Sequence, residues 1–446
     1  MFQSLRNAFK VKDLRKRLLY VFLMLVVIRF GSNLPIPGVN SGYFSDLFDK
    51  MSSNDAFGWF NTMTGGSFEQ LSVFALSITP YITSSIIIQL LTVAIPALEE
   101  MQKDGEEGRK KLTTYTRYVT IGLALIESTA MAVGFGGQGL LVGFSTASTI
   151  RKLADIVIAV VTMTSGSALL MWIGEQMTDK GIGNGISLVL LFNILSSVPQ
   201  DFLTLYERFV QGRKVAAMVV AIVIIAVVIL ALVAFTVVLQ GAERRIPVQY
   251  SRRVQGRNLV GGQSSEIPLK VNTANVMPVI FASSLMTMPV VIGQILKVDY
   301  STIGGKILMC LNSGSWCNPD APIYSLGLIL YLALLVFFAY FYTSISFNPL
   351  EVANNMKKQG GFIPGIRPGK PTSDYLENIL TYIVFIGVCG LAIIALIPIV
   401  VSGVFNVSRI SFSGTSLLII VGVVLETLKA IDSQMVVRNY KGFLDD

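Results

Sequence analysis

The sequence predicts an all-α polytopic membrane protein with ten transmembrane helices. Only 14% of its 446 residues are charged and 52% are hydrophobic, whereas a soluble globular chain carries about 25% charged residues. The apolar residues come in long blocks, and a helix that spans a bilayer needs about 20 of them. The chain contains no histidine, which excludes histidine-based zinc sites and Ser-His-Asp hydrolysis. The composition therefore excludes an ordinary soluble enzyme.

The first apolar block runs from Leu18 to Leu34, after a basic segment at residues 1–17. Because this segment places Phe2, Leu5 and Phe9 on one side, we expect it to lie as an amphipathic stretch on the membrane surface. No small-residue cleavage site closes the block, so we expect the first helix to be retained. The other blocks lie at about 71–95, 116–136, 153–173, 186–199, 215–240, 274–296, 323–346, 376–400 and 414–434.

Charge and proline positions add detail to these spans. Most of the 35 lysine and arginine residues fall in one set of alternate loops and in the segments at the two ends, including the tail at 436–446. The positive-inside rule therefore predicts that both termini are cytosolic. Pro80 and Pro278 are expected to kink the second and seventh spans. Arg29, near the end of the first span, is expected to snorkel outward.

The second and seventh spans carry polar side chains beside apolar ones. In the second span Ile78 and Ile82 share a helix face that continues into Ser85 and Gln89. This pattern is typical of a water-filled funnel with an apolar constriction, and helix–helix packing is the alternative. The polar residues of the seventh span are expected to hydrogen-bond another helix; they are Asn272, Asn275, Ser283 and Ser284.

Catalytic and cofactor-binding motifs are absent from the sequence. The chain has no HExxH, no G-x-S-x-G and no P-loop, and the glycines at 181–185 suit a tight hairpin that needs no ligand. Cys310 and Cys317 share one external loop and either form a disulfide or stay free.

Three function classes suit a polytopic membrane protein: a protein-conducting channel, a secondary solute transporter with inverted repeats, and an intramembrane enzyme. A transporter should carry charged or ion-coordinating groups at the membrane midplane, where this chain offers mainly Ile, Leu, Ser and Thr. The missing catalytic motifs argue against an enzyme. Composition and topology leave the first two classes open.

Ordered motifs along nearly the whole chain resemble the SecY family, the central channel subunits of the bacterial protein-secretion translocon. Each motif alone is weak, but their order on a ten-span frame is specific. They include Pro35-Ile36-Pro37-Gly38, Gly181-Ile182-Gly183-Asn184-Gly185, Ala242-Glu243-Arg244-Arg245-Ile246-Pro247, Phe347-Asn348-Pro349 and Pro364-Gly365-Ile366-Arg367-Pro368-Gly369.

The resemblance implies a clamshell of two inverted five-helix halves, about 18–200 and 201–435, in the bacterial cytoplasmic membrane. It implies translocation of unfolded secretory polypeptides and lateral release of transmembrane segments, with no enzymatic activity, cofactor or metal. An apolar pore ring is expected from Ile78, Ile82, Leu190, Ile280 and Ile419, with Ile186 or Ile194 beside Leu190. A plug is expected at about 57–70, including Phe57, Trp59, Phe60 and Met63. The lateral gate for signal sequences would hold Ser85, Gln89, Asn272, Asn275, Ser283 and Ser284.

The resemblance also implies partners. These are small membrane subunits of the SecE and SecG type, the SecA ATPase, the ribosome, signal sequences with their unfolded preproteins, and membrane lipids; no nucleic-acid specificity is expected. The motor and the ribosome would dock on the long cytosolic loops at about 241–273 and 347–375. The basic residues expected to contact them are Arg252, Arg253, Arg257, Lys357, Lys358 and Arg367.

Overall fold

The structure is a computed structural model. It describes residues 9–40, 61–135, 148–209, 215–250, 253–255, 258–260, 264–295, 302–317, 322–405 and 414–441, together with residues 42, 211 and 298.

Within these residues, each of the ten predicted apolar blocks contains one long helix. The helices are α2 (Lys12–Ser32), α5 (Thr79–Ala94), α7 (Gly105–Phe135), α8 (Thr149–Lys180), α9 (Gly185–Phe209), α10 (Val215–Gly241), α11 (Met277–Ile295), α13 (Leu326–Ser346), α15 (Lys370–Phe405) and α16 (Gly414–Lys441). Five helices of the described chain are long and apolar enough to cross a membrane, or six if α5 and the short α6 (Pro96–Lys103), which meet at 104°, form one broken span. The expected division at residue 200 falls inside α9.

The kinks expected at Pro80 and Pro278 are wrong, because both residues lie in the first turn of a helix. α5 begins at Thr79 and α11 at Met277. The first backbone N–H groups of a helix have no partner within it, so a proline there loses no hydrogen bond. The residues before each helix form turns, in which Ser77 and Asn275 have positive φ values of 51° and 55°.

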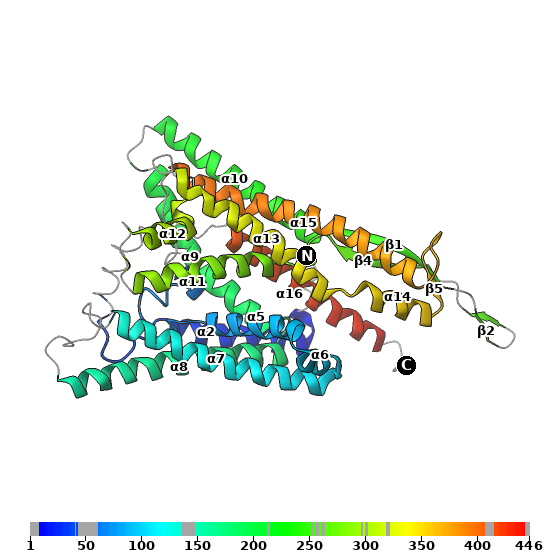
Figure 1. The fold of residues 1–446 in the computed structure, drawn as a ribbon, viewed down its shortest axis with the longest axis horizontal. Helices are drawn as coiled ribbons and strands as arrows, with labels where there is room; N and C mark the ends of the chain where they lie inside the picture. Colours follow the sequence, from blue (N-terminus) through cyan, green and yellow to red (C-terminus); the bar gives the residue numbers. More distant parts are fainter. Residues whose placement is uncertain are drawn as a thin grey trace.

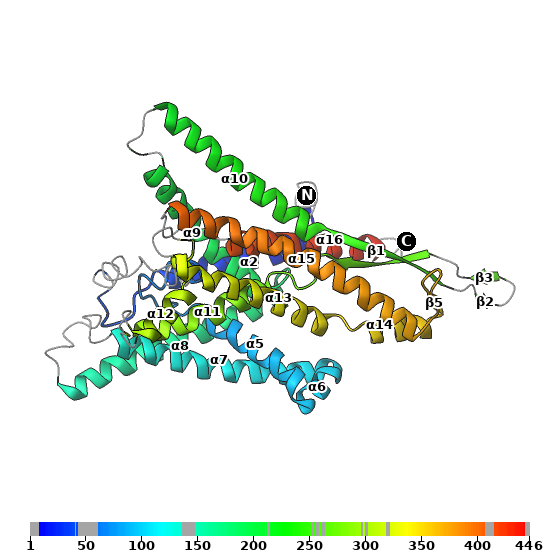
Figure 2. The same cartoon turned by 45° about the horizontal axis from the view of Figure 1, so that its top comes forward.

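The helices run roughly along the long axis of the molecule (Figure 1). α7 packs on α5 and α8, and α13 packs on α11 and α15. α9 contacts α16, so a helix from each part of the chain meets at the centre. α10 inclines away from the other helices (Figure 2) and exposes most of its apolar side chains, including Ile222. A helix that is apolar all round and this exposed suits a lipid surrounding.

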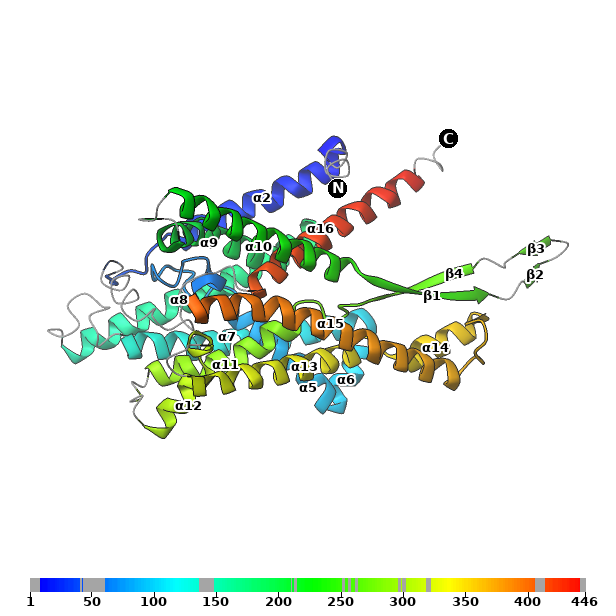
Figure 3. The same cartoon turned by 90° about the horizontal axis from the view of Figure 1, so that it is seen from above.

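The all-α prediction is wrong for the two long loops, which fold together around a small sheet. β1 (Glu243–Tyr250) pairs antiparallel with β4 (Ser264–Lys270) and with β5 (Gly361–Phe362), in the order β4-β1-β5. The short strands β2 (Arg253–Gln255) and β3 (Asn258–Val260) pair with each other. β2 and β3 lie beyond the ends of the helices (Figure 3).

The reason for the β1–β4 hairpin is a period-two pattern within β1. Ile246 and Val248 are buried while their neighbours Pro247 and Gln249 are exposed, as in a strand with one covered face. The two buried side chains join an apolar cluster with Met356 of α14 (Pro349–Lys358) and Leu376 of α15. The loops at 241–273 and 347–375 are therefore one folded module, which we call the sheet module.

The cysteine loop follows α12 (Ile303–Leu311). Cys310 lies near the end of this helix and Cys317 follows the short 3₁₀ turn η2 (Ser313–Ser315). Both thiols are free in the structure. Trp316 Nε1 donates a hydrogen bond of 2.7 Å to the carbonyl oxygen of Cys310, so an indole ring fixes this turn.

Candidate functional site

The centre of the molecule is an apolar cluster to which both parts of the chain contribute. Ile78, Leu190, Ile280 and Ile419 are buried in it, with exposed fractions of 0%, 7%, 8% and 2%. Ile82 is half-buried and packs against the same cluster. The five residues expected in the pore ring thus all belong to this apolar cluster or pack against it. We call these five side chains the central cluster.

Four elements place these side chains. Ile78 caps the N-terminus of α5, and the others lie on α5, α9, α11 and α16. The backbone N–H of Ile82 donates to the Ile78 carbonyl oxygen at 3.1 Å, so these two remain one helical turn apart. Of the two alternatives beside Leu190, Ile194 is buried in the apolar core and Ile186 is partly buried against it.

The side chains of the central cluster are aliphatic. Aliphatic side chains neither donate nor accept hydrogen bonds, so a constriction made of them dewets and resists ions. Within the described residues no group of three or more acidic or cysteine side chains is placed to hold a metal. The centre therefore offers an apolar surface that makes no hydrogen bonds through these side chains.

The expected plug segment is described from residue 61 onward. Phe57, Trp59 and Phe60 lie outside the described residues, whereas Met63 is 5% exposed and belongs to the apolar core. Asn193 of α9 donates through Nδ2 to the Met63 carbonyl oxygen at 3.2 Å. The segment is therefore attached to α9 by a polar contact as well as an apolar one.

The expectation that Arg29 points outward is wrong. Its Nη1 lies 2.9 Å from the carbonyl oxygen of Gly65 and 3.4 Å from Ser196 Oγ. A half-buried guanidinium finds an acceptor here inside the protein, which removes the reason to snorkel. Asn193 and Ser196 were not singled out from the sequence. The signal that points to them is a polar pair three residues apart in an otherwise apolar block.

The expected lateral-gate residues are scattered over two helices and the turn before one of them. Ser85 and Gln89 are half-buried on α5. Ser284 is half-buried on α11, while Ser283 hydrogen-bonds Tyr331 of α13. The partner of Ser283 therefore lies in the same half of the chain as α11.

Two amides lie in the turn before α11. Asn272 is 5% exposed, and its Nδ2 has no hydrogen-bond partner among the described residues; the same holds for Oδ1 of Asn275. Val271, Asn272 and Thr273 border a small cavity closed by α13 and α15. Leaving a buried polar atom unpaired costs about 1 to 3 kcal/mol, so this turn holds hydrogen-bonding capacity that the described chain does not use.

The expected docking residues concentrate at the sheet module. Lys357, Lys358 and Arg367 are exposed. Arg252 and Arg257 lie outside the described residues, and Arg253 begins β2 with its side chain not described. The backbone at Arg367 is held firmly, because Thr372 Oγ1 donates to its carbonyl oxygen at 2.8 Å. The backbone of the turn is thus fixed at Arg367, and the side chain of Arg367 is exposed on it.

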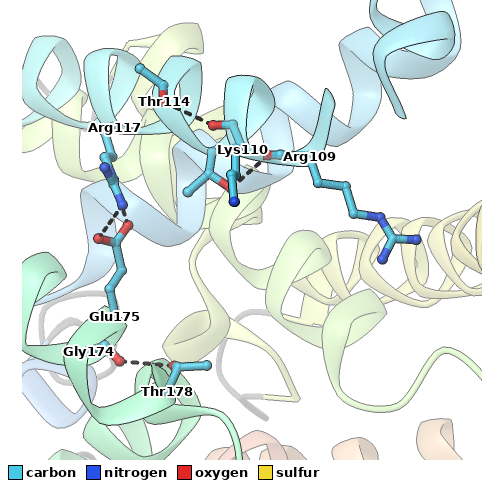
Figure 4. A network of polar contacts seen from close by, with 8 residues as sticks. Arg109, Lys110, Thr114, Arg117, Gly174, Glu175 and Thr178 are labelled. Carbon is cyan, nitrogen blue, oxygen red and sulfur yellow. Dashed lines mark hydrogen bonds and ion pairs between the residues drawn. The ribbon is translucent and has the colours of Figure 1, made fainter. Parts of the chain in front are cut away.

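An ion pair fastens α7 to α8 near the expected cytosolic surface (Figure 4). Arg117 donates through Nε to Glu175 Oε1 and lies within 2.9 Å of Oε2 through Nη2. This two-point geometry is the strongest form of arginine–carboxylate pairing. One turn on, Thr178 donates to the Gly174 carbonyl and accepts from the backbone N–H of Gly185 at 2.9 Å. The start of α9 is thereby tied to α8.

Known proteins are similar to this chain over its whole length. The SecY family model matches residues 72–428. Protein translocase subunit SecY of Streptomyces coelicolor is 43% identical over 450 residues, and the alignment covers 100% of both chains.

Solved structures share the fold. One superposes with a TM-score of 0.63 at 19% identity and covers 94% of this chain and 92% of that one. Its description states that the plug domain of the SecY protein stabilises the closed state of the translocation channel and maintains a membrane seal. Sec61 in the canine ribosome–channel complex from the endoplasmic reticulum superposes with a TM-score of 0.62 at 17% identity and the same coverage.

Proposed function

This chain belongs to the SecY family, and on that premise we propose that it is the protein-conducting channel of a bacterial cytoplasmic membrane. It passes unfolded secretory polypeptides across the membrane and releases transmembrane segments sideways into lipid. The observation that carries this proposal is the central cluster, in which aliphatic side chains from four helices meet, on a chain 43% identical to a protein translocase subunit along its whole length.

The central cluster is the seal of the closed channel in this proposal. Ile78, Ile82, Leu190, Ile280 and Ile419 close around the path without bonding to a chain that slides through. The segment at about 57–70 is the plug that covers the external side. The contact of Met63 with the apolar core and with Asn193 supports this role.

The polar residues of α5 and the turn before α11 form the lateral gate in this proposal. Signal sequences leave toward lipid between these elements. The unpaired polar atoms of Asn272 and Asn275 support the role, since an entering peptide or water can bond to them.

In this proposal ten helices span the membrane with both termini in the cytosol, an orientation that the charge asymmetry of the loops supports, and the two inverted halves meet where α9 contacts α16. The sheet module then lies in the cytosol, where it docks the ribosome or the SecA motor. The exposed Lys357, Lys358 and Arg367 support an electrostatic contact of this kind. The small SecE- and SecG-type subunits complete the complex within the membrane.

A reconstituted translocation assay tests the proposal. Proteoliposomes would hold this chain with its SecE-type partner, and SecA, ATP and an unfolded secretory precursor would be added outside. The measured quantity is precursor protected from external protease. We expect ATP-dependent protection with the wild type and its loss in Arg367→Glu, because the reversed charge repels an acidic docking surface.

The matched control is Arg109→Glu, which makes the same charge change at an exposed arginine at the start of α7. It should keep most of the activity. Absent protection with a folded wild-type complex and an active motor would overturn the channel assignment and favour a solute transporter. Equal activity of the two variants would overturn the docking role of Arg367 alone.

A further inference from the structure

We propose that Arg29, Asn193 and Ser196 form a polar clamp that holds the plug segment in its closed position by the backbone from Met63 to Gly65. The inference rests on the proposed plug role of that segment and names the residues that position it. The clamp joins three stretches far apart in sequence, namely α2, α9 and the segment itself.

Asn193 holds the first end of the clamp. Its side chain is 4% exposed, and Nδ2 donates both to the Met63 carbonyl oxygen at 3.2 Å and to Ser77 Oγ at 2.9 Å. An amide nitrogen has two hydrogens to donate, so these two bonds use its whole donor capacity. Asn193 therefore ties the segment to the turn that leads into α5.

Gly65 holds the second end. Its carbonyl oxygen accepts from Arg29 Nη1 at 2.9 Å. Ser196 Oγ lies 3.3 Å from the same oxygen and 2.7 Å from the Asn193 carbonyl oxygen, so its single hydrogen is shared between the two acceptors. Bonds from a charged donor are stronger than neutral ones, and the low dielectric of a half-buried site strengthens them further. A guanidinium from α2 and a hydroxyl from α9 thus converge on one backbone oxygen.

The fit of the segment against α9 is close enough to require glycine at residue 65. Its φ is +66°, and a β-carbon there would lie 2.9 Å from Ser196 Oγ and 3.0 Å from the α-carbon of Asn193. Gly66 has a similar conformation, with φ at +82°, but a β-carbon there would meet nothing within 4 Å. The two glycines share the same backbone requirement, and only Gly65 touches the clamp.

The clamp contacts the backbone of the segment, which has a consequence for its release. Carbonyl oxygens are present whatever side chains the segment carries, so the clamp fixes position and tolerates side-chain changes in the plug away from residue 65. Moving the segment away breaks the bonds of Asn193, Arg29 and Ser196 together, so the plug should leave in one step when α2 and α9 shift relative to it.

The test compares two matched pairs in the reconstituted complex with its small subunits. The first pair is Gly65→Ala and Gly66→Ala, which impose the same left-handed strain on alanine. The second is Ser196→Ala and Ser128→Ala; Ser128 bonds Thr164 of α8, away from the clamp. The readouts are passive ion efflux from proteoliposomes, precursor translocation and thermal melting.

We expect Gly65→Ala to raise efflux about tenfold over Gly66→Ala and Ser196→Ala to raise it severalfold over Ser128→Ala, as the loss of one or two hydrogen bonds predicts. Thermal melting checks that each variant is folded under the conditions of the efflux assay. Equal efflux within both pairs would overturn the clamp. If the wild-type complex still translocates the precursor, the channel assignment stands in that case. Wild-type complex that fails to translocate would overturn the proposed function instead, so the two failures are distinguishable. Should Gly65→Ala not assemble, the serine pair decides alone.

Discussion

Truncating Ile419 should weaken the closed state of the channel more than it weakens the fold. Ile419 lies on α16, is 2% exposed and packs in the central cluster with Ile78 and Leu190 from the first part of the chain. In the proposed function these elements separate when a polypeptide enters between them. Ile419→Ala therefore removes buried apolar surface from the closed form and little from the open one.

The size of the effect follows from the groups lost. Alanine lacks about three of the carbon groups of isoleucine, and each buried group contributes about 0.8 kcal/mol. The closed form should lose about 2 kcal/mol relative to the open form, which lowers the closed-to-open ratio about 30-fold. Ile222→Ala on α10 is the control, because Ile222 is 50% exposed on a helix that faces outward.

Single-channel recording in planar bilayers measures this ratio directly as open probability. Ile419→Ala should open about 30-fold more often than wild type, while Ile222→Ala should match wild type. Thermal melting of the purified complexes would check that both variants are folded. An open probability for Ile419→Ala no higher than that of Ile222→Ala would refute the claim that the central cluster is broken on opening.

Two further predictions concern the sheet module and the α7–α8 ion pair. Val248 is fully buried in β1, so Val248→Ser should lower the free energy of unfolding of the sheet module by about 2 kcal/mol. The β1–β4 hairpin should then be cleaved faster by protease. Gln249→Ser, on the exposed face of β1, should be cleaved at the wild-type rate. Glu175→Gln breaks the two-point pair with Arg117, whose side chain is 47% exposed, and should lower the free energy of unfolding by about 1 kcal/mol. This loss, measured by thermal melting, should shrink at high salt. Glu99→Gln, which removes an exposed pair with Lys103, should change melting little; a larger loss there than for Glu175→Gln would contradict the argument.

Local pattern was sufficient to locate the helices and the stripe of Ile78 and Ile82, whereas Leu190, Ile280 and Ile419 were expected from the resemblance to the SecY family. Each apolar block contains a helix, because a run of apolar side chains buries its backbone only by bonding it internally. The four-residue spacing of Ile78 and Ile82 survives even though α5 begins after Ile78. This spacing depends on the local backbone conformation, which residues close in the sequence determine.

Proline positions show where local reasoning fails. Pro80 and Pro278 lie inside apolar blocks, so hydropathy predicts a bent helix through each of them. The turns before α5 and α11 place both residues in a first turn instead. Those turns are stabilised by distant partners such as the Asn193 amide that bonds Ser77, and no local pattern reveals such a partner.

The sequence by itself determined the class of protein, the order of its apolar helices and the aliphatic character of its centre, since these depend on composition and short-range periodicity. Only the tertiary structure decided which polar groups meet. Arg29 and Gly65 lie 36 residues apart, and Arg29 and Ser196 lie 167 apart, yet the three converge. The same holds for β1 and β5, which pair across more than a hundred residues to form the sheet module. Hydrogen bonds are short and directional, so their partners are known only when the packing of the helices is known.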